Sequence, residues 1–490
     1  MKLNLYPTIG LETHAELLTE SKLFCSCSAK FGGGENEHCC EGCSAFPGAM
    51  PSLNKKALEL SVRAGVALNC DIARYTTWER KNYFYPDLAS AYQVSQNAKP
   101  ICVNGSLEVL VGNEAKTFRI NNIHLEEDAG KLTHEGNKSY IDYNRAGVPL
   151  IEIVTEPDFH TAEEVVAYVE KLRQMLQYAD ICDGKMEQGS LRCDVNISLA
   201  TPEDTAAGKL GTRTEIKNLN SVRSIGRAIA AEIERQTEIL ENGGRVIQQT
   251  LRFNDTGSYG EIIPMRSKEN AHDYRYFADP DIPAVTLTEE EIQRFTDELP
   301  ELPEVRYKRY TGEYGLSGKD AETLLADKNV SDFYDTALKS YDSPKSIANL
   351  VIGELLRRVN LGEAVMLELP DGFAADFAEL QKYVDEGKVN RDFRKEILRE
   401  MLESCNAEKN SNRKTAKQIC DERDLWLKED LSAVEAVIDA VIAANPKAVE
   451  QYRSGEVKVF GFLMGQASKE LKGSASPTIV KKTLEIKLKV

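Results

Sequence analysis

The sequence of 490 residues contains no apolar run close to the roughly 18 residues that a membrane-spanning helix needs. Its start, MKLNLYPTIG, also lacks the basic and then apolar order of a signal peptide. We therefore expect a cytoplasmic protein that does not enter a membrane. The formal net charge of −17 argues against nucleic-acid binding over the whole surface, because an acidic surface repels phosphate. Contact with nucleic acid would need a local basic surface.

Common nucleotide-binding and hydrolase motifs are also missing. Gly-Lys pairs occur, but none is followed by Ser or Thr, so there is no Walker A loop, and there is no Gly-x-Gly-x-x-Gly fingerprint. A Gly-x-Ser-x-Gly elbow is absent, which leaves no basis for a serine hydrolase. If the chain handles a nucleotide, it must use carboxylate-held magnesium on a different scaffold.

Cysteine is concentrated in one short segment. Five of the eleven cysteines lie within residues 25–43, as Cys25-x-Cys27 and Cys40-x-x-Cys43 with Cys39 beside the second pair. Two close pairs of thiolates can complete a tetrahedron around zinc with no open position, as in structural sites. Redox-active thiols and buried thiols are the alternatives. Because Cys40 has the two-residue gap to Cys43, we expect the two pairs to bind the metal and Cys39 to be surplus.

Apolar and polar residues alternate along Thr8–Glu16, as they do in a half-buried strand. Residues two apart in a strand point the same way, so Glu12, His14 and Glu16 would share one face. Such a row of ligands is suited to a metal ion, although a solvated strand face has the same pattern.

The pattern of strand and helix signals changes along the chain. The first part has short alternating segments and many turn residues, together with a helix that Thr161 and Glu164 begin as a capping box and a second helix that Ser221 caps. Helix signals dominate afterwards, and a polar stretch near residue 409 indicates a linker. We predict an α+β protein, with an N-terminal mixed or antiparallel sheet domain, the cradle, followed by two all-helical modules. The predicted bounds are 1–295, 296–408 and 409–490.

The C-terminal segment has a positive net charge, unlike the chain as a whole. From Tyr452 onward eight basic residues face three acidic ones. The basic residues are Arg453, Lys458, Lys469, Lys472, Lys481, Lys482, Lys487 and Lys489. This segment is the best local candidate for a contact with a phosphate backbone, and a merely solvated lysine-rich tail is the alternative.

Ordered motifs along nearly the whole chain carry a resemblance to a known family. They include TIGLETHAELLT, KLFCSCS, FPGAMPSLN, RKNYFYPDL, AYQVSQ, HLEEDAGK, DYNRAGVPLIEIVTEPD, RCDVNIS, RTEIKNLNS, RSKENAHDYRYF and FLMGQASKELKG. In these motifs the chain closely resembles the B subunit of aspartyl/glutamyl-tRNA(Asn/Gln) amidotransferases.

The resemblance implies an ATP-dependent enzyme of protein biosynthesis that acts on mischarged Glu-tRNA(Gln) or Asp-tRNA(Asn). The side-chain carboxylate of the substrate would be phosphorylated and then amidated with ammonia from glutamine hydrolysis. The implied protein partners are a glutaminase (the A subunit) and a small stabilising C subunit, and the nucleic-acid partner is tRNA and not DNA. A tRNA-docking scaffold whose chemistry is done by its partners is the second class of function, and a convergent set of carboxylates would argue against it.

The same motifs imply the residues of the site. Glu12 and His14 in GLETH, Glu126 and Glu127 in HLEED and Glu215 in RTEIK are implied at the magnesium site, with Glu12, Glu127 and Glu215 as its main ligands. Nitrogen is a poor ligand for magnesium, so His14 could instead bond to metal-bound water or to the substrate.

Two further sets are expected at the substrate. Arg192 and Lys217 would offset phosphate charge, with ion pairs as the alternative. Tyr83, Tyr85 and Tyr92 would stack on the terminal adenosine of the tRNA, with packing in the core as the alternative.

The chain departs from the family pattern in two places. Ala89, Ser90 and Ala91 stand where the family usually has Pro-Lys-Gly, so a basic contact there is lost or supplied by Lys99 or another chain. Ala278 replaces a usual proline. The complete thiol set, which some relatives lack, supports a structural zinc site that takes no part in catalysis.

Overall fold

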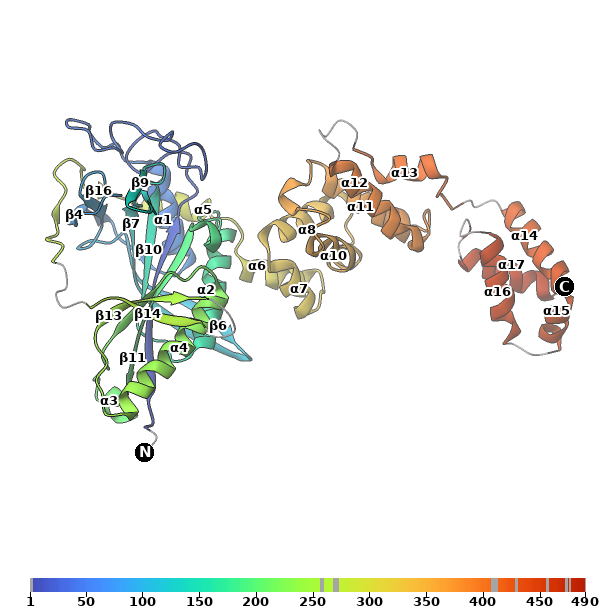
Figure 1. Ribbon diagram of the computed structural model, residues 1–490. Helices are drawn as coiled ribbons and strands as arrows, with labels where there is room; N and C mark the ends of the chain where they lie inside the picture. Colours follow the sequence, from blue (N-terminus) through green and yellow to red (C-terminus); the bar gives the residue numbers. More distant parts are fainter. Residues whose placement is uncertain are drawn as a thin grey trace. The chain divides into compact units, whose positions relative to one another are not determined.

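The computed structural model describes residues 3–255, 260–267, 273–406, 413–427, 431–454, 458–471, 475 and 477–489. It divides into two compact units, Met1–Pro303 and Glu304–Val490. Figure 1 draws the first in blue to yellow and the second in gold to red. The first unit contains a mixed sheet and the second is helical, which confirms the predicted α+β class. Among the helices described, none has the length and apolar character needed to cross a membrane.

A nine-stranded sheet organises the first unit, with the N-terminal strand β1 at its centre. The strand order is β14-β13-β12-β11-β1-β10-β7-β6-β2, and among the described pairings only β12 with β13 is parallel. The strands are β1 (Tyr6–Glu16), β2 (Asp71–Ile72), β6 (Cys102–Val111), β7 (Glu114–Glu127), β10 (Pro149–Thr155), β11 (Leu191–Ala200), β12 (Thr214–Lys217), β13 (Gln249–Asn254) and β14 (Glu261–Ser267).

Helices bury one face of this sheet. Alternate residues of β1, such as Leu11 and Ala15, are buried in the hydrophobic core. Helices α2 (Ala162–Tyr178) and α4 (Val222–Glu241) pack against each other, and they pack on β6 and β11 respectively. The predicted start signals are confirmed, because Thr161 and Glu164 form a capping box at α2 and Ser221 caps α4. The opposite face of the sheet carries polar side chains, such as those of Glu12 and His14 on β1.

Smaller elements surround the sheet in Figure 1. They are α1 (Lys55–Ala67), β3 (Tyr75–Thr76), β4 (Glu79–Asn82), β5 (Tyr92–Ser95), β8 (Lys131–Glu135), β9 (Lys138–Asp142), η1 (Met186–Gln188), α3 (Pro202–Ala206), β15 (Phe277–Ala278), β16 (Val285–Thr286) and α5 (Glu289–Asp297). Between β1 and α1 lies the knuckle, residues 17–54, in which the described β-bridge joins Ser21 to Ser28. The cluster of cysteines lies in this irregular segment.

The second unit consists of short helices. They are α6 (Pro303–Lys308), η2 (Arg309–Glu313), α7 (Gly318–Leu325), α8 (Lys328–Ser340), α9 (Pro344–Leu350), η3 (Val351–Leu355), α10 (Leu356–Asn360), η4 (Met366–Glu368), α11 (Phe373–Asp385), η5 (Arg391–Phe393), α12 (Arg394–Asn406), α13 (Ala416–Arg423), α14 (Leu431–Ala444), α15 (Pro446–Arg453), α16 (Val459–Glu470) and α17 (Pro477–Lys489). Helix α13 packs on α11 and α12, whereas α14–α17 enclose a core of their own, which includes Ile438, Leu463 and Leu484. The predicted division of this unit at residue 409 stays a prediction, and the predicted linker falls largely on residues 407–412, which lie outside the described residues.

Candidate active site

The face of the sheet that the helices leave open carries ionisable side chains from several strands. On β1, Leu11, Thr13 and Ala15 are buried while Glu12, His14 and Glu16 alternate with them. The same alternation on β11 and β12 directs Arg192, Asp194, Glu215 and Lys217 to this face. The one-sided strand expected from the sequence at Thr8–Glu16 is therefore present, and together with β11 and β12 it forms what we call the polar face.

A first acidic group joins three strands of the polar face. Candidate ligand atoms of Glu12, Asp194 and Glu215 all lie within 4.8 Å of one another. Glu12 lies opposite Asp194 in the register of β1 and β11, and it accepts a hydrogen bond of 2.9 Å from Asn196 Nδ2. Burial raises the pKa of Glu12, and the charges of Glu152 and Glu215 raise it further. Burial and the nearby carboxylates therefore make Glu12 harder to ionise than an isolated glutamate.

Lys217 provides the cation nearest to this group. Its Nζ lies 2.5 Å from Asp194 Oδ2 and 2.9 Å from Glu215 Oε1. Burial would lower the pKa of Lys217, but the carboxylates of Asp194 and Glu215 outweigh it and hold the pKa above its usual value. The structure thus shows the ion-pair alternative for Lys217, with its ammonium held by the same oxygens that a metal ion would use.

A second group lies on the other side of β1. Ligand atoms of His14, Glu126 and Glu152 lie within 4.8 Å of one another, and His14 Nε2 is 3.4 Å from Glu152 Oε2. His124 Nε2 approaches the same Glu152 oxygen at 3.2 Å. Glu126 Oε2 is buried and has no hydrogen-bond partner among the described residues. A buried carboxylate oxygen without a donor is costly, so this group fits a bound cation.

Lys81 lies at the edge of the second group. Burial disfavours its ammonium, but the charges of Glu126 and other neighbours outweigh this and raise the pKa of Lys81. Its Nζ also lies 5.2 Å from the centre of the Tyr274 ring. Lys81 therefore places a positive charge beside the second group, a role that the motifs had not indicated.

Arg192 is already in an ion pair. Its guanidinium lies 2.7 Å from the buried Asp128, which Arg145 also approaches at 3.5 Å. Burial and the charge of Asp128 raise the pKa of the neighbouring Glu16 to about 7. As with Lys217, the structure shows the ion-pair alternative for Arg192.

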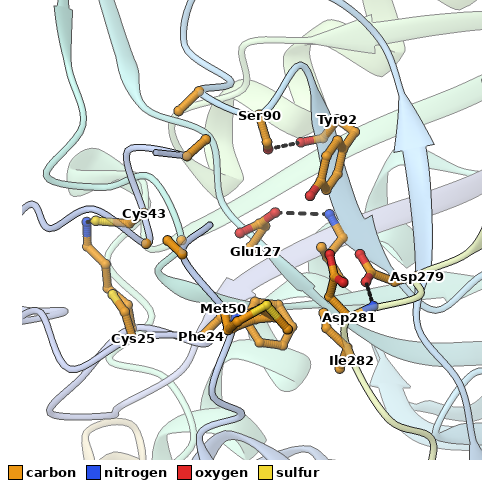
Figure 2. A pocket seen from close by; sticks show the side chains of 18 of the residues that line it. Phe24, Cys25, Cys43, Met50, Ser90, Tyr92, Glu127, Asp279, Asp281 and Ile282 are labelled. Atoms are coloured by element: carbon orange, nitrogen blue, oxygen red, sulfur yellow. Dashed lines mark hydrogen bonds between the residues drawn. The ribbon is translucent and has the colours of Figure 1, made fainter. Parts of the chain in front are cut away.

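Glu127 does not lie with Glu12 and Glu215, contrary to the expectation from the motif. Consecutive residues of a strand point to opposite faces, so Glu126 faces His14 while Glu127 turns away. Its side chain accepts a hydrogen bond of 3.0 Å from Val94 N and lines a cavity of about 330 Å³ beside the knuckle. Figure 2 shows it in this cavity between the side chains of Cys43 and Asp279. Burial raises the pKa of Glu127 to about 7.

The three tyrosines do not form one stacking surface. Tyr83 packs edge-on against Tyr274, with ring centroids 5.9 Å apart. Tyr85 is exposed, and Tyr92 lies under the Arg80 guanidinium at 4.3 Å and lines the cavity of Figure 2. Tyr83 lies near the second group, because burial raises its pKa and the charge of Glu126 raises it further.

The four thiols predicted as ligands are brought together in the knuckle. The sulfur atoms of Cys25, Cys27, Cys40 and Cys43 lie within 4.8 Å of one another, which makes them a candidate four-cysteine metal site. Zinc–sulfur bonds of about 2.3 Å in a tetrahedron imply sulfurs roughly 3.8 Å apart, and Cys40 Sγ lies 4.0 Å from Cys43 Sγ.

The surroundings of Cys43 suit a thiolate. Cys40 N–H donates to Cys43 Sγ at 3.2 Å, and the Nζ of the fully buried Lys22 lies 3.5 Å from the same sulfur. A hydrogen bond from the Cys25 thiol, the backbone of Cys40 and the charge of Lys22 together lower the pKa of Cys43. Cys39 lies outside the set of four, with its sulfur 4.0 Å from Asn36 Oδ1.

Comparison with known proteins places these features in a family. Residues 7–293 match the model of the GatB/GatE catalytic domain, and residues 332–488 match that of the GatB domain. The chain is 45% identical over 485 residues to the B subunit of the aspartyl/glutamyl-tRNA(Asn/Gln) amidotransferase of Carboxydothermus hydrogenoformans, covering 98% of both chains. The chain belongs to this B-subunit family. The corresponding protein of Ruminiclostridium cellulolyticum is 46% identical over 485 residues, covering 98% of this chain and 97% of the relative.

The resemblance inferred from the motifs is thus confirmed, and both acidic groups and the four thiols lie within the part that matches the catalytic domain of the B-subunit family. The motifs had left two members of these groups unassigned, Asp194 and Glu152. Alternation along the sequence places Asp194 on the same face as Arg192, and Glu152 likewise stands between buried apolar residues of β10, but alternation does not indicate which residues they meet.

Proposed function

We propose that this chain is the tRNA-binding and phosphorylating subunit of a tRNA-dependent amidotransferase. It would bind Glu-tRNA(Gln), Asp-tRNA(Asn) or both, activate the side-chain carboxylate with ATP and convert it to the amide. The observation that carries this proposal is the pair of acidic groups on one sheet face, one of which holds a buried carboxylate oxygen that has no partner among the described residues. The name of both relatives, the B subunit of an aspartyl/glutamyl-tRNA(Asn/Gln) amidotransferase, supports the same reaction.

Magnesium fits the first group best. Glu12, Asp194 and Glu215 offer only oxygen ligands, which this hard ion prefers. Asp194 takes the place that the motif had assigned to Glu127. The second group, His14, Glu126 and Glu152, would hold another divalent ion, with His14 as a direct ligand or as a hydrogen-bond partner of bound water. Bound magnesium would supply neutralisation of the charge on the phosphate oxygens.

The residues of the polar face would position the reacting groups. An oxygen of the tRNA-borne carboxylate attacks the γ-phosphorus of ATP, and ADP leaves. Ammonia then attacks the activated acyl carbon, the bond from this carbon to the phosphorylated oxygen breaks, and inorganic phosphate leaves with that oxygen and a proton released by the ammonia nitrogen. Two negatively charged reactants must meet in the first step, so Lys81 and Lys217, both held in the charged form by neighbouring carboxylates, would lower their mutual repulsion.

The knuckle would have a structural role. Four thiolates leave no open position on a zinc ion, and Lys22 offsets part of their negative charge from the buried side. This zinc would order the segment that forms one wall of the cavity beside Glu127.

Partner proteins would complete the enzyme. A glutaminase, the A subunit, would supply ammonia and a small C subunit would complete a heterotrimer, because this chain carries no motif of a serine hydrolase. The C-terminal helices would hold the tRNA away from its reacting end. There Lys447 and Lys458 line a hollow next to the exposed Phe462, whereas Lys487 is paired with Asp439. Of the predicted basic residues, Lys472 lies outside the described residues.

The test separates activation from ammonia supply. The complex assembled from wild type, Glu12→Gln, Asp194→Asn or Glu215→Gln would be given mischarged tRNA, ATP, magnesium and ammonium, and ADP and amidated tRNA would be followed. We expect the three variants to lose both products while glutamine hydrolysis by the complex persists. Glu108→Gln removes an exposed acid of β6 in the same sheet and serves as the control.

Wild-type rates in all three variants would contradict the active-site assignment and leave the tRNA-docking scaffold as the function. Supplying Glu-tRNA(Gln) and Asp-tRNA(Asn) separately in the same assay would identify the substrate.

A further inference from the structure

Charged residues of the polar face change sign from the centre of the sheet toward its edge. Glu12 of β1 lies opposite Asp194 of β11, and Asp194 contacts Lys217 of β12. The parallel register of β12 and β13 then places Arg252 beside Lys217. Neighbouring strands lie about 4.8 Å apart, so two acids are followed by two bases within a short distance. An elongated anion with a metal at one end would match this order of charges.

Arg252 belongs to the polar face by its neighbours on β13. Leu251 and Phe253 are buried in the hydrophobic core on the other face, while Arg252 between them is exposed. Thr250, two residues away on the same face, donates a hydrogen bond of 2.9 Å to Glu215 Oε2. Because alternate residues of a strand share a face, Arg252 stands on the face of the first acidic group.

Arg252 differs from the other cations of this face in its contacts. Lys217 is paired with Asp194 and Glu215, and Arg192 is paired with Asp128. For Arg252 the part of the chain that the structure describes provides neither an ion pair nor a side-chain hydrogen bond. Like charges at neighbouring positions of paired strands repel each other. Asp194 and Glu215 already offset the charge of Lys217, so Arg252 is the cation of this pair for which the described residues supply no anion.

We propose that Arg252 binds the phosphate chain of ATP at the edge of the first acidic group. This inference rests on the proposed function and names a residue that the motifs did not indicate. Its planar guanidinium can donate two parallel hydrogen bonds to phosphate oxygens, which suits a polyphosphate better than the point charge of a lysine. While the Lys217 ammonium is paired with Asp194 and Glu215, Arg252 is the cation that can contact the phosphate chain.

Nucleotide affinity tests the proposal directly. Binding of Mg-ATP and of AMP would be measured by calorimetry without tRNA, on the full chain and on the assembled complex, for wild type, Arg252→Gln and Arg252→Lys. We expect Arg252→Gln to weaken ATP binding about 10- to 100-fold, to leave AMP binding unchanged, and Arg252→Lys to recover part of the loss. Arg74→Gln, which removes an exposed arginine that is paired with Glu289, is the control and should bind ATP as wild type does.

Manganese binding, followed by electron paramagnetic resonance, provides the second measurement. It should be the same in Arg252→Gln as in wild type, because a contact with phosphate leaves the metal ligands in place. Unchanged ATP affinity in Arg252→Gln would overturn the inference, and so would an equal loss of ATP binding and manganese binding. Wild-type protein that binds no Mg-ATP in either form would contradict the proposed function itself.

Discussion

The two candidate metal regions of the first unit are built in different ways. The acidic groups stand on strands whose backbone hydrogen bonds and buried apolar residues hold them in place without any ion. The four thiols stand in an irregular segment with a single described bridge, in which Phe31, Phe46 and Met50 are exposed. From this difference we expect that a metal ion would complete a preformed site on the polar face, whereas zinc would contribute to the folding of the knuckle.

The first and largest expected effect tests the preformed site. Asp194→Asn keeps the size of the side chain but removes one of three charges that gather around the ion position. We expect the rate of ADP formation by the assembled complex to fall about 100- to 1000-fold, while the thermal unfolding midpoint changes by less than about 3 °C. Far-ultraviolet circular dichroism and the ADP assay measure the two effects. A large drop in stability with this substitution would contradict a site that is formed without metal.

The second prediction concerns the knuckle. Cys40→Ser should lose the bound zinc and open residues 22–54 to hydrogen exchange, whereas β1, β10 and β11 keep their protection. Cys39→Ser is the matched control, since Cys39 lies outside the set of four. Metal analysis and hydrogen-exchange mass spectrometry give the two readings. Zinc lost from Cys39→Ser and retained in Cys40→Ser would show that the ligand assignment is wrong.

The local features of the fold were predictable because they depend on residues close together in the chain. The capping box of Thr161 and Glu164, the cap at Ser221 and the two cysteine pairs each lie within a few residues, and the structure contains all of them. The alternation along β1 was equally local and correctly indicated the common face of Glu12 and His14.

The composition of the acidic groups depends on register between distant strands, which no local pattern encodes. Glu12 meets Asp194 and His14 meets Glu152 only because β1 pairs with β11 and β10. Glu127 was misplaced for a simpler reason. Glu126 and Glu127 were treated as one acidic motif, although neighbours in a strand point to opposite faces.

The third prediction concerns Lys217, whose ammonium pairs with two carboxylates of the first acidic group. Lys217→Met removes the ammonium that competes with a metal ion for Asp194 and Glu215. We therefore expect manganese to bind about 10-fold more tightly to this variant than to wild type when no nucleotide is present, a gain of about 1.4 kcal/mol. Lys56→Met, which removes a surface lysine paired with Glu59, is the control. Weaker manganese binding in Lys217→Met would mean that the ammonium supports the ion position and does not compete for it.

The smallest effect concerns the scaffold behind the polar face. Burial alone would raise the pKa of Glu164, but hydrogen bonds from His160 N, Lys116 Nζ and Thr161 N outweigh it and place the pKa below its ordinary value of 4.5. The stabilisation is therefore present above the unfolded pKa and is lost as the pH falls through the folded pKa. Glu164→Gln should cost about 1 kcal/mol at pH 7, with a smaller difference at pH 4.

Urea unfolding followed by circular dichroism at the two pH values measures this cost. Glu163→Gln, at the neighbouring position of the first turn of α2, provides the comparison for a general loss of charge near the helix start. A difference that stays constant between pH 7 and pH 4 would contradict the contribution of the ionised carboxylate.

The central position of β1 has a consequence for the synthesis of the protein. β1 is translated before its partners β10 and β11, and its pairing with β11 extends to Ala200. At about 5–20 residues per second, roughly 10–40 s pass before those partners have been translated. During this interval the apolar side chains of β1 are exposed, because β10 and β11 have not yet been synthesised. We therefore expect slow translation before residue 200 to lower the yield of soluble protein more than slow translation after it.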